Sequence, residues 1–274
     1  MPLSINTNIA SLTAQRSFLN SNSALETAFE RLSTGKRINS ASDDAAGLAI
    51  ATDLNSRVSG LNQAVRNVND GISMVQIMEG TYDEVTSILQ RMRDMAVQAA
   101  NGSLSTAEKT YLETEETALV SALDAAIDQA TFNGTDLSTT GAGNTVVLLA
   151  GSNTGDQLTI SLSAANVSDA SALGVGSLNF ASAGASVIST IDTALTRVAT
   201  QRATLGAHQA QLESTVRNLS NVAENTAAAA GRIMDTDYAA ETANLTKAQI
   251  LQQAATSVLA QANAQPQAVL SLLQ

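Results

Sequence analysis

The stretch of sequence that decides the fold is residues 61–99, LNQAVRNVNDGISMVQIMEGTYDEVTSILQRMRDMAVQA. Apolar side chains recur in it at alternating steps of four and three residues, with one extra step of three at Met78. A seam with this period is typical of a long α-helix that packs along a second helix. The residues of the seam are Leu61, Val65, Val68, Ile72, Val75, Met78, Tyr82, Val85, Leu89, Met92, Ala96 and Ala99.

Signals for both ends of this helix flank the seam. The side chains of residues 42–44, Ser-Asp-Asp, offer N-cap chemistry and first-turn carboxylates. The pair Asn101-Gly102 is a typical helix stop. The sequence therefore predicts a helix from about Asp44 to Ala100, on the order of 85 Å long at the rise of an α-helix.

Two further helices are predicted downstream. Ser105 and Glu108 form a capping box, and the helix that follows should pack antiparallel to the first because the connection is short. Its apolar face is Leu112, Leu119, Leu123, Ile127 and Ala130. A second sustained heptad segment then occupies residues 191–233, interrupted by the polar residues Arg202 and Gln209. Its main positions are Ile191, Val198, Leu205, Leu212, Leu219, Thr226 and Ile233.

The composition changes in the middle of the chain. Gly, Ser, Thr and Asn are frequent between Thr131 and Gly184. Two runs in this region, Thr145–Ala150 and Gln157–Leu162, have the pattern of strands, and the turn-forming sequence GSNTGD joins them. We expect a β-hairpin or a small β element there, exposed at the surface.

Both ends of the chain carry weaker apolar stripes in which many positions are alanine. They are Ile5, Ile9, Leu12, Leu19, Leu25, Ala28 and Leu32 near the start, and Leu245, Ala248, Leu251, Ala255, Val258 and Ala262 near the end. An alanine methyl removes little area from water, so isolated helices of this kind are marginal. We expect both ends to be loosely ordered in a monomer and to fold when they pack against partners.

Together these elements predict a mainly α fold. It is a long antiparallel helical bundle or coiled coil formed by the N- and C-terminal segments, with a small β-hairpin region in the middle. Residues 1–42 and 236–274 are expected to form a terminal helical domain. Residues 43–235 are expected to form a helical bundle whose β-rich part is about 131–184. The apolar stripes on the terminal segments favour contacts with neighbouring chains.

The composition argues against several classes of function. The net charge is −11 with only 14 Lys and Arg, so we expect neither nucleic acid nor a membrane surface as a partner. Cysteine is absent and His208 is the only histidine, so we expect no metal centre. Since no nucleophile, base and metal set is clustered, we expect no enzyme and no cofactor. The opening MPLSIN lacks the features of a Sec-type signal peptide, which favours a cytosolic protein or export without a cleaved signal.

Several long motifs resemble those of bacterial flagellins, and the resemblance covers about residues 1–136 and 185–274. The motifs are SINTN at 4–8, RLSTGKRINSASDDAAGLAI at 31–50, NDGIS at 69–73, LQRMRDMAVQAAN at 89–101 and QANAQPQAVLSLL at 261–273. The resemblance implies a filament-core domain made of the two terminal segments, beside a domain of long helices with a β-hairpin. Many flagellins carry large outer domains in the middle of the chain. Here the middle is only about 50 residues long, so we expect a short form without them.

The function that this resemblance implies is that of a structural subunit, which self-assembles into the helical flagellar filament, the passive propeller for motility. The implied partners are other copies of the chain, the flagellar export apparatus, a secretion chaperone, and cap and hook-associated proteins. The apolar residues of the terminal segments are then the predicted polymerisation interface. They are Ile5, Ile9, Leu12, Leu19, Leu25, Leu32, Leu245, Leu251, Val258, Val269, Leu270, Leu272 and Leu273.

The resemblance also implies a contact with the flagellin-sensing Toll-like receptor of innate immunity. The positions that match are Gln90, Arg91, Met95, Gln98 and Glu115, with Met95 where the family often has Leu. Two other functions stay open at this point. One is a hook–filament junction protein, which shares the terminal segments but does not polymerise at length. The other is a non-flagellar coiled-coil scaffold, such as a chemoreceptor-like hairpin.

Overall fold

The computed structural model describes residues 7–138, 145–162, 167–180 and 184–271 of the chain. This part is mainly α-helical, as predicted, with two small antiparallel sheets. Its helices are α1 (Ile9–Thr34), α2 (Ala45–Ala99), α3 (Thr106–Asp128), α4 (Ala170–Leu173), α5 (Gly184–Met234) and α6 (Tyr238–Ser271). Its strands are β1 (Thr131–Phe132), β2 (Thr135–Asp136), β3 (Thr145–Leu149) and β4 (Gln157–Ser161). None of the helices in the described residues has the length and hydropathy of a membrane-spanning segment.

The chain divides into two compact units, each built from segments that are distant in sequence. The terminal unit is Met1–Ser56 with Thr226–Gln274, and the central unit is Arg57–Asn225. Both divisions fall inside helices, α2 and α5, and not near residues 42 and 235. The assignment of the intervening residues to one domain or the other stays a prediction.

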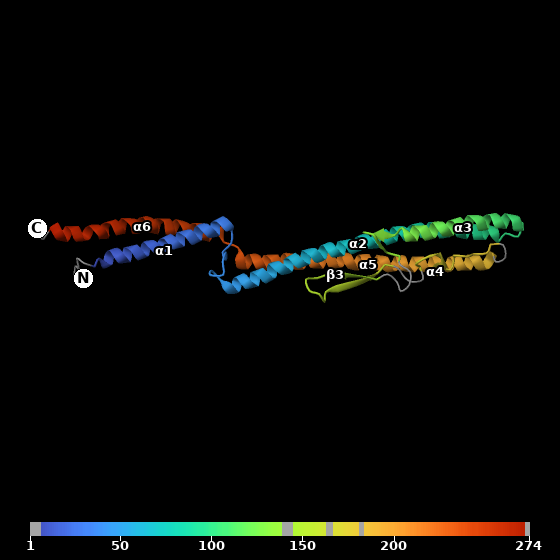
Figure 1. Ribbon diagram of the computed structural model, residues 1–274, viewed down its shortest axis with the longest axis horizontal. Coiled ribbons are helices and arrows are strands. Elements are labelled where there is room, and N and C mark those ends of the chain that lie inside the picture. The colour runs from blue at the N-terminus through green and yellow to red at the C-terminus, as the bar shows by residue number, and fades with distance from the viewer. Residues whose placement is uncertain (1–6, 139–144, 163–166, 181–183, 272–274) are drawn as a thin grey trace. The chain divides into compact units, whose positions relative to one another are not determined.

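The core of the central unit lies between α2 and α5, which lie side by side in Figure 1. The predicted seam of α2 is buried there, except that Val65 and Ile72 are half-buried. Four of the α5 heptad positions are fully buried: Ile191, Val198, Leu205 and Leu212. Large apolar side chains at heptad spacing therefore carry this packing, as the sequence predicts.

Ion pairs show that α2 and α5 run antiparallel. Arg93 Nε lies 2.6 Å from Asp192 Oδ1. Further along, Arg202 lies 2.8 Å from Glu79 Oε1 and 3.1 Å from Asp83 Oδ1. Arg202 interrupts the heptad pattern of α5, and these two carboxylates explain its place beside α2.

The capping box of α3 is present as predicted. The Ser105 hydroxyl oxygen accepts from the Glu108 backbone N–H at 3.4 Å, and Glu108 Oε2 accepts from the Ser105 N–H at 2.7 Å. The backbone N–H groups of Ser105 and Glu108, which have no partner within the helix, are thus each hydrogen-bonded to the other residue's side chain. Leu123 and Ile127 on α3 are buried in the core of the central unit.

The predicted β-hairpin is present as β3 and β4. Its register pairs Leu148 with Leu158 and Val146 with Ile160. Leu148 and Ile160 face the core, whereas Val147 on the opposite face is exposed, which is the alternation of a half-buried sheet.

Three short elements of the central unit were not predicted. β1 and β2 form a two-residue hairpin through Asn133 and Gly134, whose φ angles of 49° and 77° are those of a primed hairpin turn. α4 is a single turn between an Asp169 N-cap and a left-handed Gly174.

Candidate functional site: the paired terminal helices

The helices α1 and α6 of the terminal unit lie side by side in Figure 1. Local signals set their ends. The Asn8 side chain caps α1 by accepting from Ser11 N–H at 3.1 Å. α1 stops at Gly35, which is left-handed with φ 71° and packs closely on the Tyr238 hydroxyl. Asp237 caps α6 by accepting from Ala239 N–H at 2.9 Å.

Small side chains, together with one glutamate, fill the fully buried positions of the seam between α1 and α6. On α6 its members recur every seven residues, which is the period of a helix pair. The buried members are Ser11, Ala14 and Ala28 on α1, and Glu241, Ala248, Ala255 and Ala262 on α6. Because alanine lets two backbones approach closely but buries little area, this seam contributes little hydrophobic stabilisation per residue.

Polar contacts along the seam fix an antiparallel register. Residues near the start of α1 contact residues near the end of α6, whereas Asn22, further along α1, contacts Gln252, which comes earlier on α6. The contacts are Asn8 Nδ2 to Ala262 O at 2.7 Å, Ser11 Oγ to Asn263 Oδ1 at 2.8 Å, and Gln252 Nε2 to Asn22 Oδ1 at 2.7 Å. These directional bonds specify the pairing more sharply than an alanine seam could alone.

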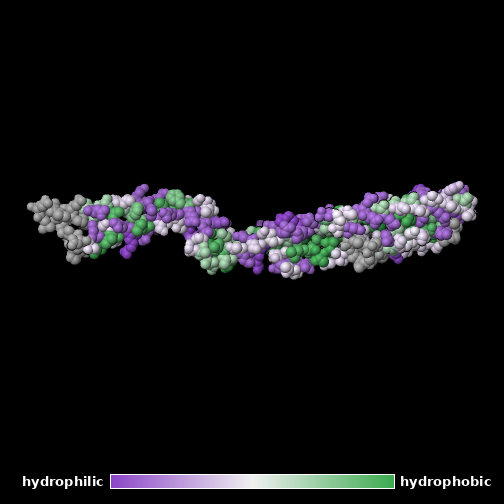
Figure 2. All heavy atoms as spheres, in the orientation of Figure 1, coloured by the Kyte–Doolittle hydropathy of each residue, from purple (hydrophilic) through white to green (hydrophobic). Residues whose placement is uncertain are grey.

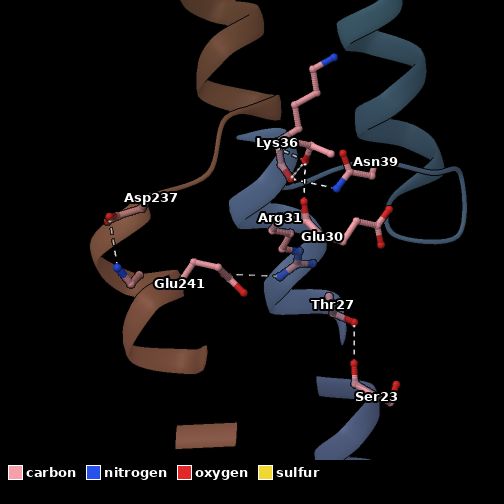
Figure 3. Close-up of polar contacts among 10 residues, drawn as sticks. Ser23, Thr27, Glu30, Arg31, Lys36, Asn39, Asp237 and Glu241 are labelled. Atoms are coloured by element: carbon pink, nitrogen blue, oxygen red, sulfur yellow. Dashed lines mark hydrogen bonds and ion pairs between the residues drawn. The ribbon is translucent and has the colours of Figure 1, made fainter. Parts of the chain in front are cut away.

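A charged contact lies at the end of the seam where α1 finishes and α6 begins. Figure 3 shows Arg31 of α1 reaching Glu241 of α6, with Nη1 and Oε2 3.9 Å apart. Glu241 is buried, and Arg31 Nε is also buried with no hydrogen-bond partner among the described atoms. The long distance makes this contact a better determinant of register than of stability.

Two connecting segments meet next to this contact. Lys36 and Asp235 form an isolated antiparallel bridge. Arg37 donates from its backbone N–H to Met234 O at 2.6 Å and from its guanidinium to Ile233 O at 2.8 Å. The motif RLSTGKRINS thus ties the end of α5 to the end of α1, and positions both terminal helices.

The predicted N-cap chemistry of residues 42–44 is divided between two aspartates. Asp44 Oδ1 accepts from Gly47 N–H at 2.8 Å and so caps α2. Asp43 closes the preceding turn, because its Oδ2 accepts from Ser40 N–H at 2.9 Å and Asn39 N–H at 3.1 Å. Those backbone bonds, with the Ser40 hydroxyl, hold the pKa of Asp43 below its usual range.

Large apolar side chains lie on the outside of the α1–α6 pair. Figure 2 shows hydrophobic residues at the surface of this part of the molecule, among polar ones. The exposed large residues are Ile9, Leu12, Leu19, Phe29, Tyr238, Ile250, Leu251 and Val258. The large residues Phe18, Leu25, Leu32, Leu245 and Leu259 follow the spacing of the seam but are only half-buried. The fully buried seam positions are mostly small, whereas large residues fill the seam of an ordinary coiled coil.

The predicted interface residues are distributed accordingly. Ile9, Leu12, Leu19, Leu251 and Val258 are exposed, and Leu25, Leu32 and Leu245 are half-buried. Ile5, Leu272 and Leu273 lie outside the described residues, as do the side chains of Val269 and Leu270. The assignment of these residues to an interface between copies stays a prediction.

The sequence prediction missed three exposed apolar residues, Phe29, Tyr238 and Ile250. Phe29 and Ile250 lie beside Ala28 and Leu251, which were assigned to the stripes. A search for large side chains opposite the alanine positions would have found both.

The residues of the predicted receptor contact lie on α2 and α3 of the central unit. Gln90, Arg91 and Gln98 are exposed. Arg91 Nη2 lies 2.7 Å from Glu115 Oε1, and its hydrogen bond to that carboxylate raises the pKa of Arg91 above its usual range. Met95 is buried in the core, only 2 % exposed, so it can shape this surface only from beneath. The receptor contact stays a prediction.

The described residues hold no group of three or more His, Cys, Asp and Glu side chains that could bind a metal ion. The paired helices carry exposed apolar side chains on their outer faces, and polar contacts between the helices fix their register. An exposed apolar surface of this kind is typical of association with other chains.

Comparisons with known proteins place both ends of the chain in one family. Residues 5–141 match the family model of the bacterial flagellin N-terminal helical region. Residues 188–273 match that of the bacterial flagellin C-terminal helical region.

Full-length relatives agree with the family models. A flagellin of Halalkalibacterium halodurans is 42 % identical over 272 residues, covering 98 % of this chain and 99 % of its own. The flagellar filament 33 kDa core protein of Treponema phagedenis is 40 % identical over 288 residues, with the same coverage. The crystal structure of Bacillus cereus flagellin is similar with a TM-score of 0.50 at 29 % identity, covering 60 % of this chain and 94 % of that one.

Proposed function

Since the chain belongs to the bacterial flagellin family, we propose that its copies polymerise into a flagellar filament through the outward faces of α1 and α6. The broader function follows from the family and from the names of the relatives: it is a structural subunit that assembles with itself into the filament. These relatives give no support to a hook–filament junction protein or a non-flagellar scaffold.

One observation carries the proposal about the interface. Of the fourteen large apolar side chains that are exposed in the described residues, eight lie on α1 and α6. Both helices already pair through their seam, and the described residues of the terminal unit leave these side chains exposed. A surface of this kind is typical of a protein that buries it against neighbours.

The energetics favour the same arrangement. Fully burying one Leu, Ile or Phe side chain contributes about 1.5–3 kcal/mol, whereas an alanine seam contributes much less. The free energy that holds α1 and α6 in place would therefore come mostly from contacts between subunits. This supports the expectation that the two ends become fully ordered only on assembly.

Two valines test the interface directly, because Val258 on α6 and Val147 on β3 are each 54 % exposed. Val258→Ser should raise the critical concentration for polymerisation by about tenfold, equivalent to about 1.4 kcal/mol. Val147→Ser removes the same groups from another surface and should change it less than about twofold. Sedimentation and negative-stain electron microscopy measure the polymer, and circular dichroism of the monomers checks that both variants fold. Equal effects of the two changes would show that the interface is not on α6.

Removal of either terminal segment is a coarser test of the same proposal. Deleting the first or last thirty or so residues should leave a helical central unit that does not polymerise, because each deletion takes one partner from the α1–α6 pair. Circular dichroism should also show more helix in the filament than in the free subunit. Ordinary filaments from a truncated chain would contradict the proposal.

We extend the proposal to the route by which the subunit reaches the filament. The chain passes unfolded through the flagellar export apparatus, escorted by a secretion chaperone, and is placed beneath the cap after the hook-associated proteins. Its lack of cysteine supports this route, since no disulfide can lock a folded form. Secretion that continues after deletion of the flagellar export machinery would rule it out.

We also propose that the receptor contact lies at the exposed face of α2 and α3 around Gln90, Arg91, Gln98 and Glu115. Arg91→Ala removes the ion pair with Glu115 and should weaken activation of receptor-bearing reporter cells. Arg93→Ala is the matched control, because it removes the neighbouring ion pair with Asp192. The same response to both variants would place the contact elsewhere.

A further inference from the structure

We propose that Asn101 is a site of spontaneous deamidation, whereas Asn133 is protected from the same reaction by the fold. Both residues precede glycine, at Asn101-Gly102 and Asn133-Gly134. Both dipeptides are also exposed. Sequence and exposure therefore predict equal reactivity, and the difference comes from the backbone.

The reaction is a cyclisation followed by hydrolysis. The backbone nitrogen of Gly102 attacks Cγ of Asn101, a bond forms between these atoms, and the Cγ–Nδ2 bond breaks. The amide proton of Gly102 leaves with the departing ammonia. Water then opens the cyclic imide at either carbonyl, which gives aspartate or isoaspartate. The net change is one amide exchanged for one carboxylate, with no oxidant or reductant.

The nucleophile at Gly102 is unhindered. A side chain built at this glycine would meet nothing within 4 Å. Bonds to the neighbouring amides are known: Asn101 N–H donates to Gln98 O at 3.1 Å, and Leu104 N–H to Asn101 O at 3.4 Å. Residues 100–105 lie between α2 and α3 and belong to no strand pair, so only these two backbone bonds oppose a rotation at Asn101.

The electrophile at Asn101 is already polarised. Its Oδ1 accepts from Ser103 N–H at 3.2 Å. In the tetrahedral intermediate the negative charge develops on this oxygen, so the Ser103 N–H lies where it stabilises the intermediate. The same bond leaves Nδ2 as the free leaving group.

Asn133 lies in a different environment. It is the only non-glycine residue with positive φ in the described chain, at 49°, and Gly134 follows at 77°. Phe132 pairs with Thr135 directly across this turn. Ring closure needs the Gly134 nitrogen to turn toward Cγ of Asn133, which changes the backbone conformation that the turn fixes, so the turn and its strand pair must open first. The observed rate of deamidation at Asn133 is therefore its rate in the open hairpin multiplied by the small fraction of time that the hairpin is open.

The ratio of the two rates within one sample tests the proposal. The full-length subunit is incubated in mildly alkaline buffer, and mass spectrometry measures the conversion of each asparagine in separate peptides. Asn101 should react at least about tenfold faster than Asn133, which corresponds to an opening cost of about 1.4 kcal/mol. In urea, where the hairpin is unfolded, the two rates should become equal.

A variant separates chemistry from structure. Gly102→Ala places a methyl group in open space, so the fold should be unchanged by circular dichroism while conversion at Asn101 slows by about tenfold or more. A ratio near one in the native protein would overturn the proposal. So would a ratio that persists in urea, because it would then owe nothing to the fold.

Discussion

Leu148 of β3 packs directly onto Gly71 of α2, with its Cδ1 in the space that a side chain at residue 71 would occupy. Both residues are buried. Close by, Asn67 Nδ2 donates to Leu149 O at 3.2 Å. The hairpin is thus held on the long helix by one close apolar contact and one polar contact.

The first prediction follows from this contact. Gly71→Ala should displace Leu148 and destabilise the central unit by about 1–3 kcal/mol, because the added methyl overpacks a buried site. Gly80→Ala is the matched control on the same helix, where a side chain meets nothing within 4 Å. It should stabilise the protein by about 0.5–1 kcal/mol through helix propensity. Urea unfolding of both variants measures the difference, and a stabilising Gly71→Ala would refute the contact.

A second prediction concerns the alanine seam. Ala28→Leu should push α1 away from α6 and cost about 1–3 kcal/mol of local stability, because Ala28 is only 1 % exposed. Ala24→Leu, one turn earlier on an exposed position, should change stability by less than about 0.5 kcal/mol. Hydrogen exchange of the α1 amides reports the effect without interference from the central unit. If the two variants exchange alike, the seam does not lie where the structure places it.

A third prediction concerns a buried carboxyl group. Burial raises the pKa of Glu116 above its usual range, although Leu178 N–H donates to Oε1 at 3.4 Å and opposes the shift. Between the usual and the raised pKa, the native state binds more protons than the unfolded state, so the free energy of unfolding falls as pH rises through that window.

Glu116→Gln keeps the acceptor but cannot ionise. Its advantage in Tm over the parent protein should therefore grow as pH rises above the usual range of a carboxyl group, reaching about 1–3 °C. Glu84→Gln on the exposed face of α2 is the control and should show no such growth. A constant difference for Glu116→Gln across this range would mean that its carboxyl is not desolvated.

A fourth prediction concerns the turn before α2. Because the pKa of Asp43 is lowered by its bonds to Ser40 and Asn39, those bonds persist above the usual pKa of an aspartate and are lost as pH falls through the lowered value. The amide signals of both partners in NMR spectra should therefore move together on acidification. In Asp43→Asn this movement should disappear. Its persistence would assign the titration to another group.

The sequence predicts the central unit well because its apolar residues are large and periodic. The seam of α2 and the heptads of α5 follow directly from side-chain size and spacing, and burial confirms them. The β3–β4 hairpin follows from its turn sequence. The shortest elements were missed because two-residue strands and one-turn helices leave no period, although the Asp169 and Gly174 caps of α4 were visible.

The terminal unit was predicted less well, for a physical reason. The sequence places Ala255 and Val258 in one stripe, because both are apolar and share a helical period. In the structure Ala255 is buried in the seam and Val258 is exposed. From hydrophobicity alone, Val258 would be expected in the seam, because it is larger than Ala255 and gains more from burial. The two backbones lie so close together that only the smaller Ala255 fits between them. Met95 differs in another way: the motif resemblance assigned it to a surface contact, but packing buries it.

The hydrogen bond from Asn8 to Ala262 joins residues 254 positions apart. Contacts between residues so far apart in sequence form slowly, because a loop of almost the whole chain must close, at a cost in entropy, before the contact can form. The α1–α6 seam is therefore the last tertiary contact available to a chain that emerges from either end. Until that moment the two terminal segments have not paired with each other, and their exposed apolar side chains can meet those of another molecule first. The order in which the chain folds thus leaves a time window in which joining a neighbour competes directly with closing on itself.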